Sequence, residues 1–304
     1  MTPEVAGILS RYEGGALSAP VTLMQLLIET EDADSVRAAV ADFARTAVTH
    51  PAVENRAREL EQLLTANGSG CERIAAMLRA DVDSSEPART VEEGIAFCER
   101  LFDWSVQQSE EASVALYSLG NPALLERATA EIVSQLDRWG SLSAGAEVLD
   151  IGCGIGRLLI ALAPRVKRVV GIDVSTEMVR AAQRRCAALD NVTVMKGDGY
   201  GLGGLPDSAF DLGIAVDSFP YLRQSGYELV RRFVAESARV LRPGGQLVIL
   251  NYSYSDNDEA DSREILELAR GNGFEVLESG RRPFELWDGV AFRLVRGAQG
   301  SRFD

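Results

Sequence analysis

The sequence predicts an α/β protein whose sheet is mostly parallel with an antiparallel last strand, preceded by an all-helical N-terminal region. From residue 146 onward, short apolar runs alternate with segments of helical periodicity. Because repeated strand–helix–strand units form right-handed crossovers, this alternation indicates a parallel sheet covered by helices on both faces. Earlier in the chain, apolar residues recur at helical spacing instead. We therefore divide the chain into a helical cap or oligomerisation region, residues 1–115, and an α/β domain, residues 116–304.

Two segments of the helical region, 36–44 and 53–64, place their apolar residues on one helical face. The second segment stops at "NGSG", a run that favours a turn. The following stretch "DVDSSEPART", residues 81–90, is polar and contains proline, so we interpret it as a linker.

Two further helices are predicted from their start signals. Thr90 and Glu93 have the spacing of a capping box, which predicts a helix running through Leu101. Asn121 is a suitable N-cap with proline in the first helical turn, and Gly140 is a suitable stop. The helical pattern thus continues up to the first strand of the α/β domain.

The α/β domain begins with alternating strands and helices. The predicted strands are Glu147–Ile151, Arg168–Ile172, Val192–Met195, Leu212–Val216 and Gln246–Leu250. The predicted helices are Arg157–Leu162, Glu177–Ala188, Glu228–Val240 and Asp261–Arg270. "DSFPYLRQSG", after the fourth strand, is interpreted as a loop. The last strands, Phe274–Glu278 and Val290–Val295, are separated by too few residues for a crossover, so we expect them to pair as an antiparallel hairpin.

Composition limits the partners and the compartment. The 304 residues carry a formal net charge of −14, which repels phosphate backbones and anionic lipid, so neither nucleic acid nor a membrane is an expected partner. No apolar run approaches the ~18 residues of a membrane span, and the N-terminus lacks the pattern of a signal peptide. Cys71, Cys98, Cys153 and Cys186 have neither zinc nor disulfide spacing, which favours a reducing cytoplasm.

Acidic residues follow the predicted strands at the edge where ligands of parallel sheets bind. Asp150 lies in "VLDIGCGIGR", whose glycines at alternate positions differ from the dinucleotide pattern. Asp173 ends the second strand and can accept hydrogen bonds from both hydroxyls of a ribose. Asp198 is suited to an adenine amino group, and Asp217 lies nearest the reacting end of a ligand. Any one of these acids could instead cap a helix. A series at successive strand ends favours a nucleoside site.

These motifs together resemble the class I S-adenosylmethionine-dependent methyltransferases. The matching stretches are "VLDIGCGIG", the acid at Asp173, "GDG" at residues 197–199, "DLGIAVDSF" and "VLRPGGQLVI". The resemblance covers roughly residues 120–296 and implies a Rossmann-like sheet with S-adenosylmethionine as cofactor and no metal. The cofactor-binding residues it implies are Asp150, Gly152, Cys153, Gly154, Gly156, Asp173, Val174, Met178, Gly197, Asp198, Gly199 and Asp217. Its glycines are expected to let the backbone approach the methionine part of the cofactor.

The acceptor is expected to be a small molecule. The residues after the fourth strand read "DSFPY", which departs from the N-P-P-Y pattern of methyltransferases that act on nucleic-acid or glutamine amino groups. The only histidine, His50, lies far upstream, and we expect it at a helix end or on the surface. Candidate catalytic residues are Tyr117, Tyr221 and Tyr252. Further candidates to line an acceptor pocket are Phe219, Asn251, Tyr254 and Trp287.

Two other functions remain open. A relative of the fold could bind the cofactor yet catalyse a cyclisation or elimination, or the chain could methylate a protein or nucleic acid. The helical region is expected to cover the acceptor pocket. The alternatives are a dimerisation arm, which would make the protein a homodimer, and a separate partner-binding domain.

Overall fold

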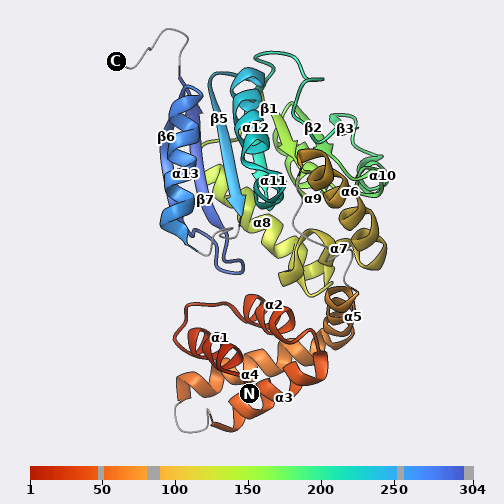
Figure 1. The fold of residues 1–304 in the computed structure, drawn as a ribbon, viewed down its shortest axis with the longest axis vertical. Coiled ribbons are helices and arrows are strands. Elements are labelled where there is room, and N and C mark those ends of the chain that lie inside the picture. The colour runs from red at the N-terminus through yellow and green to blue at the C-terminus, as the bar shows by residue number, and fades with distance from the viewer. Residues whose placement is uncertain (47–50, 81–89, 252–256, 298–304) are drawn as a thin grey trace. The chain divides into compact units, whose positions relative to one another are not determined.

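The computed structural model describes residues 1–46, 51–80, 90–251 and 257–297, and contacts divide the chain into two compact units (Figure 1). The unit that we call the helical unit comprises Met1–Ser84, Trp104–Glu131 and Phe284–Asp288. The unit that we call the sheet unit comprises Ser85–Asp103, Ile132–Pro283 and Gly289–Asp304. Each unit therefore combines stretches that are distant in sequence, and the boundary after residue 115 stays a prediction.

The helical unit is built from short amphipathic helices. They are α1 (Pro3–Glu13), α2 (Ala19–Thr30), α3 (Ala33–Thr46), α4 (Pro51–Ala66), α5 (Gly68–Arg79), α7 (Glu110–Val114) and the 3₁₀ turn η2 (Leu116–Ser118). Thr2 and Ser18 cap α1 and α2, because their side chains accept hydrogen bonds from backbone N–H groups of the first turn. Leu23 and Leu60 are fully buried in the core. The helices expected at 36–44 and 53–64 are confirmed as α3 and α4.

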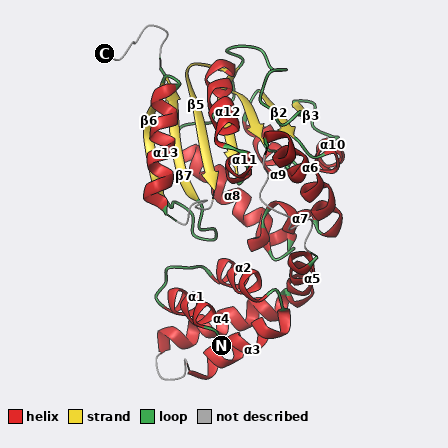
Figure 2. Ribbon diagram, viewed as in Figure 1, coloured by secondary structure: helices red, strands yellow, loops and turns green. Residues whose placement is uncertain are grey.

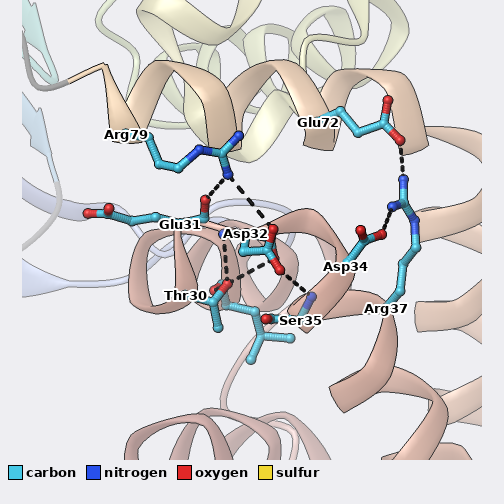
Figure 3. A network of polar contacts seen from close by, with 9 residues as sticks. Thr30, Glu31, Asp32, Asp34, Ser35, Arg37, Glu72 and Arg79 are labelled. Carbon is cyan, nitrogen blue, oxygen red and sulfur yellow. Dashed lines mark hydrogen bonds and ion pairs between the residues drawn. The ribbon is translucent and has the colours of Figure 1, made fainter.

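Ion pairs on the surface of the helical unit connect α5 with the turn between α2 and α3 (Figure 3). Arg37 of α3 bridges Asp34 and Glu72, and Arg79 of α5 donates to the carbonyl oxygen of Glu31. Because these side chains are largely exposed, each pair contributes at most about 1 kcal/mol to stability. The network therefore contributes little to the stability of the unit.

A short stretch between the last two strands completes the core of the helical unit. Trp287 is 3% exposed and stacks on Tyr117, with ring centroids 5.7 Å apart. The carbonyl oxygen of Leu286 accepts from Ser18 Oγ at 2.7 Å, and its N–H donates to Glu131 at 3.1 Å. A deletion ending before Val91 would remove the Ser18 hydroxyl that donates to Leu286, so it would disturb more than the N-terminal region.

The sheet unit contains a seven-stranded sheet of order β3-β2-β1-β4-β5-β7-β6 (Figure 2, yellow). Its strands are β1 (Glu147–Ile151), β2 (Arg168–Asp173), β3 (Val192–Lys196), β4 (Phe210–Val216), β5 (Leu241–Asn251), β6 (Phe274–Arg281) and β7 (Val290–Arg296). Strands β1 to β5 pair in parallel, and β7 is antiparallel to both β5 and β6. The predicted strands and the antiparallel last strand are confirmed, although β7 lies inside the sheet and β6 forms its edge.

The remaining helices belong to the sheet unit, except that α6 and α8, which precede β1, have residues in both units. They are α6 (Val91–Gln108), α8 (Pro122–Arg138), α9 (Arg157–Leu162), α10 (Thr176–Cys186), α11 (Phe219–Ser225), α12 (Tyr227–Val240), α13 (Asp258–Gly271) and the 3₁₀ turn η3 (Ala163–Arg165). Figure 1 shows α12 and α13 in front of the strands. The capping interactions expected of Thr90 and Asn121 are present, since their side-chain oxygens accept from Glu93 N and Ala123 N. Among the described residues, no helix combines the length and apolarity needed to cross a membrane.

One expected loop is a helix. The interpretation of "DSFPYLRQSG" as a loop is wrong, because Phe219–Ser225 forms α11. Pro220 lies in the first turn, where its missing N–H costs nothing and its fixed φ suits a helix. Gly226, at φ +136°, then separates α11 from α12. The segment that follows β4 is thus helical.

Candidate functional site

The carboxyl ends of the five parallel strands lie along one edge of the sheet and carry most of the residues singled out from the sequence. In the order of the sheet, they are Asp198, Asp173, Asp150 with the glycine loop, Asp217 and Asn251. The predicted placement of the acids at successive strand ends is therefore present in the structure. Their binding roles stay predictions.

The glycine loop after β1 is shaped by two neighbouring helices. Gly152 has φ +78°, and a Cβ there would lie 2.5 Å from Cβ of Ser218, at the start of α11. Gly156 has φ +78°, and a Cβ there would lie 3.2 Å from Cβ of Ala182 in α10. Both glycines therefore make room for protein atoms in a conformation that other residues rarely adopt. The sequence analysis explained these glycines by the approach of a ligand. At positions 152 and 156, packing against neighbouring side chains also requires glycine.

Asp173 connects β2 to the glycine loop. Its Oδ2 accepts from the backbone N–H of Gly154 at 2.8 Å, and its Oδ1 accepts from that of Ser175 at 2.9 Å. Burial raises the pKa of Asp173, and the hydrogen bonds from Ser175 and Gly154 oppose this effect. Each carboxylate oxygen has further lone pairs, so the oriented group can still accept from the two hydroxyls of a ribose.

Asp150 is a buried acid beside the loop. Its side chain is 1% exposed, and Oδ2 has no hydrogen-bond partner among the described residues. Burial raises the pKa of Asp150 from 3.8 to about 7, with Arg157 lowering it and Asp173 raising it. A buried carboxylate oxygen without a hydrogen-bond partner is costly, and a cation placed beside it would reduce that cost. This environment fits the ammonium group of the methionine part of the cofactor.

The turn after β3 contains the third predicted segment. Asp198 is exposed and its Oδ1 accepts from the N–H of Tyr200 at 2.8 Å. Gly199 has φ +78°, and a Cβ there would lie 2.5 Å from Ile95 of α6 and 3.1 Å from Val174. Helix α6 thus borders the turn that contains Asp198.

The other predicted cofactor residues differ in their burial and backbone conformation. Met178 and Cys153 are buried, with 1% and 5% exposure, so they contribute packing below the loop. Gly197 packs on Ile172, 3.0 Å from the position of its missing Cβ. Asp217 adopts φ +55°, which is uncommon for a residue other than glycine and is often found at functional sites.

The tyrosine candidates fall in different places. Tyr221 lies in α11, where its ring packs edge-on against Phe102 with centroids 4.8 Å apart. Tyr117 belongs to the helical unit, where it is 2% exposed. Tyr252, like His50 and Tyr254, lies outside the described residues. Within the sheet unit, Phe219 is buried beside Tyr221 in α11 and Asn251 is fully buried at the end of β5, whereas Trp287 belongs to the helical unit.

The sequence predicted a helix here but did not reveal that the part of α6 in the sheet unit contacts the candidate site. Asp103 Oδ1 accepts from Ser175 Oγ at 2.6 Å and from the N–H of Glu177 at 2.9 Å. Glu99 accepts from Lys196 Nζ at 2.5 Å. Only the four-residue spacing of Ile95, Glu99 and Asp103 indicates a common face, and that spacing does not reveal what the face contacts. In the part of the chain that the structure describes, no cluster of three potential metal ligands occurs.

Comparisons with known proteins show which proteins this chain is similar to. Residues 149–249 match the model of a methyltransferase domain. The chain is 34% identical over 115 residues to a demethylmenaquinone methyltransferase of Tropheryma whipplei (strain Twist), covering 37% of this chain and 44% of that protein. It is 27% identical over 147 residues to the S-adenosyl-L-methionine-dependent Diels-Alderase iccD of Talaromyces variabilis, covering 47% and 49%. The chain therefore spans about half the length of these relatives.

A solved structure supports the fold. Phosphoethanolamine N-methyltransferase 1 of Haemonchus contortus, in complex with phosphoethanolamine and S-adenosylhomocysteine, aligns with a TM-score of 0.54 and 19% identity. The alignment covers 71% of this chain and 52% of that chain. At this identity, the likeness concerns the fold, and the predicted Rossmann-like sheet is confirmed.

Three findings agree: the order of the strands, the glycine loop with the acids that follow it, and the matched methyltransferase domain. The cofactor expected from the resemblance, S-adenosylmethionine, is the one that defines the family. Residues 149–249 of this chain therefore form a methyltransferase domain of the kind found in the class I S-adenosylmethionine-dependent methyltransferases.

Proposed function

We propose that this protein transfers the methyl group of S-adenosylmethionine to a small-molecule acceptor. The observation that carries the proposal is the Asp173 carboxylate, whose two oxygens are oriented by the N–H groups of Gly154 and Ser175. This arrangement holds a bidentate acceptor for a ribose diol beside the glycine loop and the buried Asp150. It supports binding of a nucleoside that carries a positive charge at its other end.

The protein's part in the reaction is mainly to position the reactants. S-adenosylmethionine, when bound, supplies a methyl group that its sulfonium has already activated. Asp173 and Asp198 would hold the nucleoside, and Asp150 would face the ammonium group. Holding donor and acceptor in line can lower the barrier by about 7–11 kcal/mol. Tyr221, in the helix that follows Asp217, is the described tyrosine best placed to contact an acceptor, and Tyr117 and Tyr252 stay candidates from the sequence.

Charge and similarity support a small acceptor. The net charge of −14 disfavours polyanions. The Tropheryma whipplei relative is named for methylation of demethylmenaquinone, a small molecule. The four cysteines are buried and free, which fits the proposed cytoplasmic location. The acceptor is to be sought by incubating the purified protein and S-adenosylmethionine with a metabolite panel, and by measuring S-adenosylhomocysteine together with methylated products.

A second candidate is a cofactor-dependent cyclisation without methyl transfer. It is favoured by the similarity to a relative named as a Diels-Alderase that depends on S-adenosyl-L-methionine. The same panel separates the two functions, because a cyclase converts its substrate without forming S-adenosylhomocysteine. Conversion of an acceptor without that product would replace our proposal by this one.

Asp150 should make cofactor binding depend on pH. Since burial raises the pKa of Asp150 to about 7, the free protein holds a proton there at lower pH. A bound ammonium favours the carboxylate, so affinity should be highest above pH 7 and should fall by up to about tenfold per unit below it. Because the pKa of Asp150 in the folded protein lies above the ordinary value of 3.8, the free energy of unfolding of the free protein should fall as the pH rises from 3.8 toward 7.

Titration calorimetry with S-adenosylmethionine at several pH values measures this dependence. Asp150→Asn is the matched control, because it keeps the shape of the side chain and removes the titrating group. We expect weak, pH-independent binding for this variant. Equal pH dependence in the variant and the wild type would show that another group titrates.

A further inference from the structure

We propose that Asp103 of α6 is a positioning residue of the cofactor site, which holds the ribose-binding turn after β2 in place. This inference rests on the proposed function, because it concerns the turn that carries Asp173. The turn runs from Asp173 to the first residues of α10. Asp103 lies 72 residues before Ser175 in sequence and reaches the turn from a helix that precedes the sheet.

Ser175 links the two acids. Its N–H donates to Asp173 Oδ1 at 2.9 Å, and its hydroxyl donates to Asp103 Oδ1 at 2.6 Å. The same hydroxyl accepts from the N–H of Met178 at 3.0 Å, as the N-cap of α10. Ser175 is fully buried, so water cannot replace these partners. The position of the Asp173 carboxylate is therefore coupled to Asp103 through one residue.

Asp103 also binds the start of α10 directly. The N–H of Glu177 donates to its Oδ1 at 2.9 Å. This N–H is among those that a helix leaves without an internal acceptor, and the partial positive charge of a helix N-terminus favours a carboxylate there. Without Asp103, the Ser175 hydroxyl and the Glu177 N–H would both lose their acceptor, and the turn would become less ordered.

Two further contacts of the same helical face fasten α6 over neighbouring strand ends. Glu99, one turn before Asp103, accepts from Lys196 Nζ at 2.5 Å, and Lys196 also donates to the carbonyl oxygen of Val174 at 2.7 Å. Ile95, one turn earlier again, fills the space beside Gly199. This face of α6 therefore contacts the residues next to Asp173 and Asp198 but supplies no ligand group to Asp173 itself. Its role is to order the site before the cofactor arrives.

The test compares the affinity of Asp103 variants for S-adenosylhomocysteine, measured by titration calorimetry on the full chain. Asp103→Ala should weaken binding by about tenfold, because the turn must be ordered on binding. Asp103→Asn keeps an acceptor oxygen and should bind within about threefold of the wild type. Asp137→Ala is the matched control, since it removes an exposed carboxylate of α8 whose partner is Arg165. It should leave affinity unchanged.

The outcomes separate this inference from the proposed function. Wild-type affinity in folded Asp103→Ala would overturn the positioning role, and so would failure of the asparagine variant to restore binding. If Asp103→Ala does not fold, Ser175→Ala provides the comparison and should show a similar loss, whereas wild-type binding by that variant would contradict the link. If the wild type itself binds no S-adenosylhomocysteine, the proposed function fails and this inference fails with it.

Discussion

Asp173→Ala is expected to weaken S-adenosylhomocysteine binding by on the order of tenfold to several hundredfold, because two charge-assisted hydrogen bonds to the ribose are each worth roughly 1.5–3 kcal/mol. The substitution also removes the acceptor of the Gly154 and Ser175 N–H groups. The glycine loop should therefore lose its connection to β2. A moderate loss of stability is expected together with the loss of affinity.

Calorimetric titration of the wild type and the variant tests this expectation, with thermal unfolding to verify that the variant is folded. Asp198→Ala is the comparison within the same site, and it should lose less affinity because an adenine amino group is a neutral donor. Unchanged affinity in folded Asp173→Ala would refute the assignment of the ribose to this residue. A larger loss of affinity in Asp198→Ala than in Asp173→Ala would contradict the assignment of the ribose to Asp173 and of the adenine to Asp198.

Gly152→Ala is expected to destabilise the protein by about 2–4 kcal/mol, since it adds overpacking to an unfavourable backbone conformation. The new Cβ would lie 2.5 Å from Cβ of Ser218, and φ at this position is +78°. The clash would move the start of α11 away from the loop. The hydrogen bond from Ser218 Oγ to the carbonyl oxygen of Ile151, 2.7 Å long, would be weakened.

Denaturant unfolding of four proteins measures the two contributions: the wild type, Gly152→Ala, Ser218→Gly and the double variant. Removing the Ser218 side chain relieves the clash but not the strain, so the coupling between the two positions should reach about 1 kcal/mol or more. Gly145→Ala is the matched control, because nothing lies within 4 Å of the position of its Cβ. A Gly152→Ala protein as stable as the control would show that the loop adapts at little cost.

The sequence predicted the α/β domain closely because its signals are local. Strand β1 and helix α9 have the predicted bounds, since apolar runs and helical periodicity define them within a few residues. Helix α11 was missed because it is short and begins with Phe219 and Pro220 directly after Ser218, a run that reads as a loop. The sequence did not predict that β7 lies between β5 and β6. The short spacing of a hairpin shows that its two strands pair, but it does not show which of them pairs with β5.

For the candidate site, a rule of topology was sufficient to place the acids, because parallel strands bring their carboxyl ends to one edge. The same rule says nothing of Asp103, whose partner Ser175 is far away in sequence. The family resemblance attributed the glycines to the ligand alone, whereas Gly152 and Gly156 pack against Ser218 and Ala182. These contacts depend on how helices pack on the finished sheet. They become visible only in three dimensions.

The central claim is that the strand ends bind S-adenosylmethionine through Asp173. The most direct test is an experimental structure of the protein with S-adenosylhomocysteine bound. We expect both ribose hydroxyls within hydrogen-bond distance of the Asp173 carboxylate, the adenine amino group near Asp198 and the ammonium group near Asp150. A nucleoside bound elsewhere, or a structure in which Asp173 contacts only Gly154 and Ser175, would contradict the account.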